Sequence, residues 1–303
     1  MEATERFKTL NIADKPMVDS IILRDTHRGC DYCFGNNFLW SSAYKTEFAV
    51  LCGAYVPRYK RGILNVYNYP AGALPDRINS ARYIIQNEKR NWCFRGLDNK
   101  HKEELEKYFP DMFIYYNDRN AADYLYSSDK LISLAGKKLQ SKRNHIRRFE
   151  DEPDWCFEEI NNDNIRECRI FSEMWYSRYG ESREDIEFER SALDTAFDYF
   201  NALGLCGGII RRKGEVVAFS IGEPICTDTF CVHFEKAVAE LQGAYAIINR
   251  EFAKRFCGSY RYINREEDMG HEGLRKAKLS YYPDMLLEKY IAVPIVDVAQ
   301  KLN

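Results

Sequence analysis

The stretch from Thr229 to Tyr290 holds the residues whose order most clearly suggests chemistry. A run typical of a β-strand, Thr229–Lys236, is followed by a loop with one glycine, Gly243, and then by a helical pattern over 244–256. A strand, a tight loop and a helix N-terminus direct several backbone N–H groups to one place, where the helix dipole also favours negative charge. This order predicts a phosphate or carboxylate site, although it is also the commonest connection in α/β proteins.

Two adjacent tyrosines, Tyr281 and Tyr282, follow a lysine-rich segment that ends near Lys278. A tyrosine hydroxyl can protonate a leaving group, although tyrosine is also a routine core residue. His233, on the strand-like run, is more typical of a buried core histidine than of a base.

A helical pattern over 130–149 carries an apolar stripe that is interrupted by Lys142 and Arg143. A cation on a buried face is costly unless it is paired, so one of these side chains is expected to face a cleft, a carboxylate or a bound anion. The alternative is that their long stems reach past the core to solvent. The seven basic residues of this helix could also contact RNA, or could simply form a solvated face.

Cys30 and Cys33 form a C-x-x-C pair close to His27. A structural zinc site needs four ligands, and no second C-x-x-C pair is present to complete one. Surface thiols are therefore favoured, and no metal site is predicted. The sequence also has no G-x-S-x-G, Walker or H-E-x-x-H motif, which excludes the enzymes defined by those motifs.

The composition is that of a soluble globular protein, with 45% hydrophobic and 30% charged residues among 303. A net charge of -2 gives no global attraction to nucleic acid or acidic membranes, so such attraction would need a local patch. No apolar run is long enough to span a membrane, and ten scattered cysteines without a signal peptide indicate reduced thiols and a cytoplasmic location. The oligomeric state is not indicated.

The chain is expected to form two α/β units, each with a hairpin followed by helices that alternate with strands. The first hairpin is expected from two aromatic-rich runs, 48–56 and 62–69, joined by 57–61. The second is expected to turn at Lys213-Gly214. The boundary is placed near Ser127, which gives domains 1–127 and 128–303, the second including the joining helix.

Several motifs together resemble a known family. They are Glu235-Lys236-Ala237, Gly243-Ala244-Tyr245 with Ile248-Asn249, Asn264-Arg265-Glu266-Glu267-Asp268-Met269-Gly270, Gly273-Leu274-Arg275-Lys276-Ala277-Lys278, Ser280-Tyr281-Tyr282-Pro283, and Lys137-Lys138 with Lys142-Arg143-Asn144-His145-Ile146. Over most of its length the chain is similar to bacterial proteins that resemble the cytosolic C-terminal domain of phosphatidylglycerol lysyltransferases. The resemblance implies two GNAT-like domains in tandem, each a mixed, mostly antiparallel sheet flanked by helices, as in the Fem-type aminoacyl transferases.

The resemblance also implies an activity and a set of site residues. Relatives of known function move an aminoacyl group from tRNA to an amine or hydroxyl, and ordinary GNAT enzymes move an acyl group from coenzyme A. Either donor is open here, with no metal. The expected catalytic residues are Tyr281, Tyr282 and Lys278; the donor would contact Glu235, Gly243, Ala244, Tyr245 and Asn249; the substrate would contact Lys142, Arg143, Asn144, Asn264, Asp268 and Arg275.

The chain departs from these relatives in two ways. The lipid-transferring relatives carry a long membrane domain that is not expected here, which weakens the case for a lipid acceptor. In addition, Glu240 begins the loop where GNAT enzymes have basic or amide residues. A degenerate, non-catalytic binding module or an RNA-binding protein remain alternatives. The N-terminal half, which has no loop like that of Gly243, is not expected to bind donor. Replacement of Gly243 by valine is expected to abolish donor binding at little cost in stability.

Overall fold

The computed structural model describes residues 6–23, 26–180 and 184–295. Within them the chain forms two compact units. The first contains the chain up to Asp123, together with Glu267–His271 and the segment from Leu286 onward; the second contains Tyr124–Glu266 and Glu272–Met285. The chain thus passes from the first unit to the second close to the expected boundary at 127, and then returns twice to the first.

The first unit is built on a sheet of seven strands among the described residues, in the order β1-β2-β3-β4-β5-β14-β6. The β14 strand comes from the C-terminal segment, which the sequence assigned to the second domain, and it lies between β5 and β6. The elements of this unit are β1 (Lys8–Thr9), α1 (Lys15–Ile22), α2 (Phe34–Leu39), α3 (Ser41–Tyr44), β2 (Glu47–Leu51), β3 (Ala54–Arg61), β4 (Leu64–Asn68), α4 (Leu74–Asn87), β5 (Trp92–Leu97), α5 (Asn99–Tyr108), β6 (Phe113–Asn117) and β14 (Tyr290–Pro294), with short 3₁₀ turns at Ile12–Asp14, Cys30–Tyr32 and Arg119–Ala121.

The first hairpin differs from the prediction. Residues 57–61 were expected to form its loop but continue the β3 strand, and the chain turns instead at Cys52-Gly53 and at Gly62-Ile63. Both glycines have positive φ, which a turn between paired strands requires. Pro57 is tolerated inside β3, opposite Phe48 of β2. The result is a three-stranded meander, whose inner face packs with α4 and α5 in one aromatic-rich core.

The second unit is built on a sheet with the order β13-β7-β12-β11-β10-β9-β8. The β11 and β12 strands are parallel, and β10 is antiparallel to both β9 and β11. The predicted turn at Lys213-Gly214 is confirmed, with Arg212 opposite Glu215. The elements are β7 (Asp123–Ser127), α6 (Ser128–Ser133), α7 (Gln140–Glu150), β8 (Trp155–Glu159), α8 (Ile165–Tyr179), α9 (Glu184–Asp198), α10 (Phe200–Leu203), β9 (Cys206–Arg212), β10 (Glu215–Cys226), β11 (Thr229–Ala237), α11 (Ala244–Phe256), β12 (Tyr262–Asn264), α12 (Glu272–Leu279) and β13 (Met285–Leu287).

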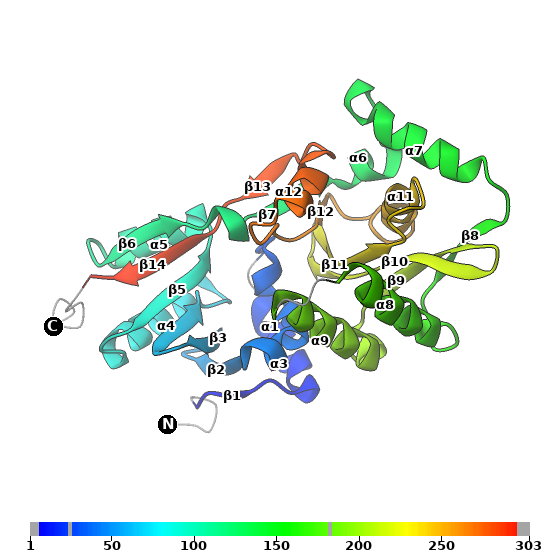
Figure 1. The fold of residues 1–303 in the computed structure, drawn as a ribbon. Coiled ribbons are helices and arrows are strands. Elements are labelled where there is room, and N and C mark those ends of the chain that lie inside the picture. The colour runs from blue at the N-terminus through cyan, green and yellow to red at the C-terminus, as the bar shows by residue number, and fades with distance from the viewer. Residues whose placement is uncertain (1–5, 24–25, 181–183, 296–303) are drawn as a thin grey trace. The chain divides into compact units, whose positions relative to one another are not determined.

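Helices cover both faces of the second sheet (Figure 1). The α11 helix packs on one face, where Phe252 meets Phe230 of β11, and α8 and α9 pack on the other, where Phe171 and Phe197 meet Phe219 of β10. Both α6 and α7 lie against α11. The sheet therefore holds α11 in place, and α11 in turn supports α7.

The joining helix predicted over 130–149 is not continuous. It breaks after Ser133, because Leu134 and Gly136 adopt positive φ, and a short 3₁₀ turn at Lys137–Leu139 precedes α7. Arg143 of α7 closes the break, since its guanidinium donates hydrogen bonds to the carbonyl oxygens of Leu134 and Gly136. In the part of the chain that the structure describes, no helix is both long and apolar enough to cross a lipid bilayer.

Candidate functional site

The predicted strand, loop and helix are present in the second unit, where β11 ends at Ala237 and α11 begins at Ala244. Gly243 caps α11 with a φ of 91°. A Cβ at this position would overlap the carbonyl oxygen of His145 in α7. Gly243 is therefore required where α11 and α7 approach each other, which contradicts the expectation that a valine here would cost little stability.

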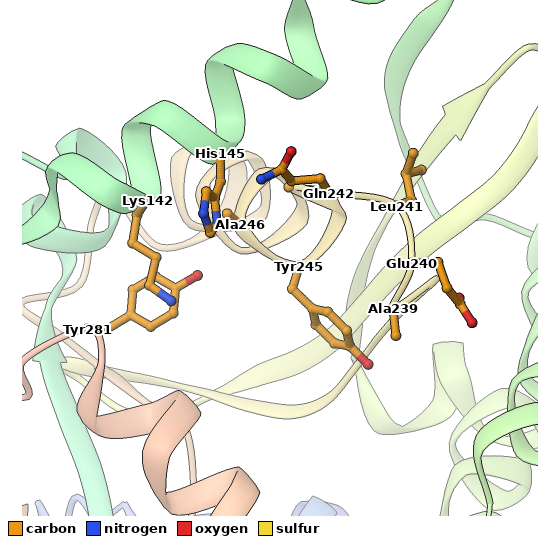
Figure 2. A pocket seen from close by; sticks show the side chains of 10 residues that line it. Lys142, His145, Ala239, Glu240, Leu241, Gln242, Tyr245, Ala246 and Tyr281 are labelled. Atoms are coloured by element: carbon orange, nitrogen blue, oxygen red, sulfur yellow. The ribbon is translucent and has the colours of Figure 1, made fainter.

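A pocket of about 450 Å³ opens at this helix N-terminus, within the second unit. Its walls come from the loop before α11, the first turn of α11, α7 and the segment after α12 (Figure 2). Lys142 and Tyr281 lie together at one end, and Glu240 lies at the other. The lining residues are Lys142, His145, Ala239, Glu240, Leu241, Gln242, Gly243, Tyr245, Ala246 and Tyr281.

Lys142 reaches the pocket because the interrupted stripe of α7 faces it. Its ammonium nitrogen lies 4.0 Å from the centre of the Tyr281 ring, a distance at which a cation is attracted by the ring face. Burial lowers the pKa of Lys142 to about 8; repulsion from Arg265 acts in the same direction, and Glu235 partly offsets both. The expectation was that Lys142 or Arg143 points into the cleft between the two domains; Lys142 instead lines a pocket within the second unit.

A buried ion pair lies next to Tyr281, at the end of the pocket that Lys142 and Tyr281 line. The Arg265 guanidinium is 2.9 Å from Glu235 Oε1, and the Asn249 amide donates to Glu235 Oε2 at 3.0 Å. Arg265 also lies 5.0 Å from the centre of the Tyr281 ring, on which Lys142 also rests. Burial acts to lower the pKa of Arg265, but the Glu235 carboxylate raises it above its ordinary value, so the guanidinium stays charged.

Tyr281 is 5% exposed, and burial raises its pKa above the ordinary value, so that the hydroxyl stays protonated at neutral pH. Its hydroxyl points toward α11 (Figure 2). Beside Tyr281, Arg265 Nη1 and Asn249 Oδ1 are buried without a hydrogen-bond partner in the described residues, although neither residue lines the pocket. An unpaired buried polar atom costs about 1–3 kcal/mol.

The other expected donor-binding residues lie around the same loop. Ala244 is fully buried, and its N–H donates to Leu241 O at 3.0 Å, so this amide is not free for a ligand. Tyr245 is 37% exposed and lines the pocket. Glu240 is exposed and forms an ion pair with Arg178 at 3.0 Å, which reduces the negative potential that its carboxylate places at the loop.

The remaining expected catalytic residues do not line this pocket. Tyr282 is 45% exposed, and Lys138 lies 5.3 Å from its ring centre. Lys278 is buried, and its ammonium donates to the carbonyl oxygen of Arg265, which ties α12 to the end of β12. Lys278 thus has a structural position, and of the three expected catalytic residues only Tyr281 reaches the pocket.

The other expected substrate-binding residues are dispersed. Asn144 is exposed on α7, Arg275 is half-buried on α12, and Asn264 is buried and accepts a hydrogen bond from Glu266 N–H at 2.7 Å. Asp268 belongs to the first unit, where its buried carboxylate contacts Arg119 at 3.3 Å and Gly270 N–H at 2.9 Å. These four residues do not line the pocket, and Arg143 closes the break before α7.

Sequence reasoning missed two residues of this site, Arg265 and His145. Both lie inside motifs that resemble the family, next to residues that were expected to bind substrate, Asn264 and Asn144. A charged residue directly after the short β12 strand is a signal that could have identified Arg265. The C-x-x-C cysteines were also misplaced: Cys30 and Cys33 are buried rather than exposed thiols.

Comparisons with known proteins identify the family. Residues 25–293 match the family described as phosphatidylglycerol lysyltransferase, C-terminal. A crystal structure of a conserved protein of unknown function from Bacteroides thetaiotaomicron is 42% identical, with a TM-score of 0.90 over 95% of this chain and 99% of that chain. The structure of L-PGS from Bacillus licheniformis is 14% identical, with a TM-score of 0.64 over 98% of this chain and 95% of that chain, and is similar in fold.

Among curated proteins, an uncharacterised protein of Mycoplasmoides gallisepticum is 23% identical over 189 residues, which cover 57% of this chain and 56% of the relative. The match thus spans about half the length of that curated relative. The expected fold class of two α/β units in tandem, each a mixed sheet flanked by helices, is confirmed. The chain belongs to the family of phosphatidylglycerol lysyltransferase C-terminal domains.

Proposed function

We propose that this protein is an aminoacyl transferase that moves an aminoacyl group from tRNA to an amine or hydroxyl acceptor. The observation that carries the proposal is the end of the pocket where the half-buried Lys142 rests on the buried Tyr281. A protonated amine and a protonated phenol stand together there, backed by the charged Arg265. Such a group of donors suits a reaction in which negative charge develops on a carbonyl oxygen.

The donor is proposed to be tRNA-linked because of the basic surface beside the pocket. Lys137, Lys138, Arg147 and Arg148 are exposed on α7 and the turn before it, and α7 also supplies Lys142 to the pocket. Lysine and arginine side chains on one helix attract a phosphate backbone even on a protein of near-neutral net charge. The family's own name, that of a lysyltransferase, supports an aminoacyl group as the one that is transferred.

The reaction is an acyl transfer without a covalent enzyme intermediate. The acceptor nitrogen or oxygen attacks the ester carbonyl carbon of the donor, the new bond to carbon forms, and the bond to the ribose oxygen breaks. The Lys142 ammonium stabilises the oxyanion, and the Tyr281 hydroxyl donates its proton to the departing ribose oxygen. The acceptor's proton then restores the phenol. Most of the acceleration comes from holding donor and acceptor in one pocket.

The deciding experiment offers the purified protein each aminoacyl-tRNA in turn, with radiolabelled amino acid, together with small amines, hydroxyl compounds and phosphatidylglycerol vesicles. Acetyl-coenzyme A serves as the competing donor. The expected result is transfer of label from aminoacyl-tRNA to one acceptor class, with no acetyl transfer. Acetyl transfer alone would identify an ordinary GNAT donor, and tight binding of tRNA without transfer would identify a binding protein.

The role of α7 is tested by charge reversal. Arg147→Glu together with Arg148→Glu is expected to weaken tRNA binding. The slope of the logarithm of the binding constant against the logarithm of the salt concentration should become shallower, by the amount that about two phosphate contacts contribute. Arg166→Glu, an exposed position on α8, is the matched control and is expected to leave both unchanged. If the α7 double variant and the Arg166→Glu control weakened tRNA binding equally, a specific role of α7 in tRNA recognition would be excluded.

A further inference from the structure

A second cluster of reactive side chains lies in the same unit, away from the residues that line the pocket. His233 is buried on β11, with Nδ1 2.7 Å from Glu266 Oε1 and Nε2 3.1 Å from Glu223 Oε1. The Cys231 sulfur lies 3.7 Å from His233 Nδ1 and 3.7 Å from Glu266 Oε1. One thiol, one imidazole nitrogen and one carboxylate oxygen thus surround a single point.

The backbone is shaped to bring these groups together. Ile221 of β10 pairs with Phe234 and Gly222 pairs with Val232, so His233 lies in a bulge of β11. A bulge changes the direction in which side chains leave a strand, and here it brings the Cys231 thiol close to the imidazole of His233. A Cβ at Gly222 would overlap the carbonyl oxygen of Cys231, so this approach of the strands requires glycine.

Glu266 is brought in by an unusual backbone conformation. It follows β12 with a φ of 56°, a region that residues other than glycine seldom adopt. Its N–H donates to Asn264 Oδ1 at 2.7 Å, which stabilises the turn. A non-glycine residue held in this conformation marks a place where the side chain's direction matters.

We propose that Cys231, His233 and Glu266 bind one zinc ion, with Glu223 holding the other ring nitrogen of His233. The three ligand atoms lie within 4.8 Å of one another, and thiolate, imidazole and carboxylate are the ligands that zinc takes. A carboxylate on the second ring nitrogen is the usual outer partner of a zinc-bound histidine. The ion replaces the protons on the thiol and on Nδ1, which pass to solvent.

The chemistry of the three ligands also indicates which metal ion the site prefers and how many ligands the protein supplies. A thiolate is a poor ligand for calcium or magnesium, which prefer oxygen, and a good one for zinc. Three protein ligands leave a fourth position for water or a substrate atom. Because Glu266 directly follows Arg265, an ion bound to Glu266 would also restrain the guanidinium that pairs with Glu235 behind the pocket.

Another cluster with metal-binding residue types, in the first unit, already holds a lysine ammonium group and does not fit a metal. In the cluster of Cys30, Asp123 and Glu267, the Lys289 ammonium already lies 2.7 Å from Asp123 and 3.4 Å from the Cys30 sulfur.

Cobalt(II) titration of the whole protein tests the site, because cobalt takes zinc positions and reports its ligands by colour. The expected result is one ion per chain, with the near-ultraviolet thiolate-to-cobalt band and the visible bands of a tetrahedral site, all lost on addition of zinc. Cys231→Ala is expected to abolish the thiolate band. Cys257→Ala removes another buried cysteine of the same unit and is expected to keep it.

A second, milder substitution tests the site even if Cys231→Ala fails to fold. Glu223→Gln preserves the size of the side chain and its contact with His233, and it is expected to weaken zinc binding about 10- to 100-fold in competition with a chelator. Absence of stoichiometric cobalt binding by the unmodified protein overturns the proposal. A thiolate band that survives in Cys231→Ala, or a zinc affinity unchanged in folded Glu223→Gln, overturns it as well.

Discussion

The Lys142 ammonium nitrogen lies 4.0 Å from the centre of the Tyr281 ring. The Arg265 guanidinium lies 5.0 Å from the centre of the same ring, so two cations that repel each other contact one aromatic side chain. The ring's attraction partly offsets that repulsion, and Glu235 offsets more of it by pairing with Arg265. The arrangement holds a desolvated amine at the pocket, from which several expectations arise.

Transfer activity should depend on the charge of Lys142. Because burial lowers its pKa to about 8, the ammonium form predominates below pH 8 and is lost above it, so kcat should fall as pH rises through about 8. Lys142→Arg keeps a charge at all these values and should remove that fall. Lys142→Met should lower kcat on the order of 100- to 1,000-fold, as for loss of an oxyanion donor. Single-turnover rates across pH check this, and an unshifted alkaline limb in Lys142→Arg would contradict it.

The substitution Lys142→Met should also stabilise the folded protein. The pKa of Lys142 is lower in the folded chain than its ordinary value, so the folded state is penalised for carrying this charge below pH 8, and the penalty disappears as pH rises toward the unfolded pKa. Lys142→Met should therefore raise the melting temperature at pH 7, and the gain should shrink above pH 8. Thermal melts of both proteins at pH 7, 8.5 and 10 measure this; a gain that grows with pH would contradict the burial of this charge.

The two neighbouring tyrosines should differ in function. Tyr281→Phe keeps the ring beneath Lys142 but removes the hydroxyl proposed to protonate the leaving oxygen, so kcat should fall about 100-fold with donor affinity preserved. Tyr282→Phe is the matched control, because Tyr282 is 45% exposed and lies outside the pocket lining, and its rate should not change. Equal rates for the two variants would exclude the hydroxyl of Tyr281 as the proton donor.

The buried pair of Glu235 and Arg265 should be costly to break. Glu235→Gln leaves a buried guanidinium without its carboxylate, and the free energy of unfolding should fall by about 3–5 kcal/mol. Adding Arg265→Met should recover part of that loss, because no unpaired charge remains. Urea unfolding measures both. Glu240→Gln, which breaks an exposed pair with Arg178, serves as the control and should change the midpoint little.

Gly243 should be required for stability as well as for the pocket. Gly243→Ala places a Cβ against the carbonyl oxygen of His145 and strains a backbone whose φ is 91°, so it should destabilise the protein by more than about 1–3 kcal/mol. Gly258→Ala is the control, since a Cβ there meets nothing within 4 Å. Denaturant midpoints compare them, and an unchanged midpoint in Gly243→Ala would refute the proposed packing of α7 on α11.

Local patterns were enough for much of the fold and for the position of the pocket. Lys213-Gly214 predicted the turn between β9 and β10, because turn chemistry acts over a few residues. The strand, loop and helix around Gly243 were read from the sequence in the same way. The break in the apolar stripe singled out Lys142 because a helix places its residues on a face in a fixed period.

Only the tertiary structure decided which distant residues meet. The β14 strand enters the first sheet between β5 and β6, although nothing local distinguishes it from a strand of the second unit. The break at Leu134–Gly136 is stabilised by Arg143, which lies several residues away in the next helix. Arg265 meets Glu235 across two strands, and Cys231 and His233 meet Glu266 through a bulge. Such contacts depend on strand order and on backbone turns set by packing of the whole unit, so no periodicity within one segment can specify them.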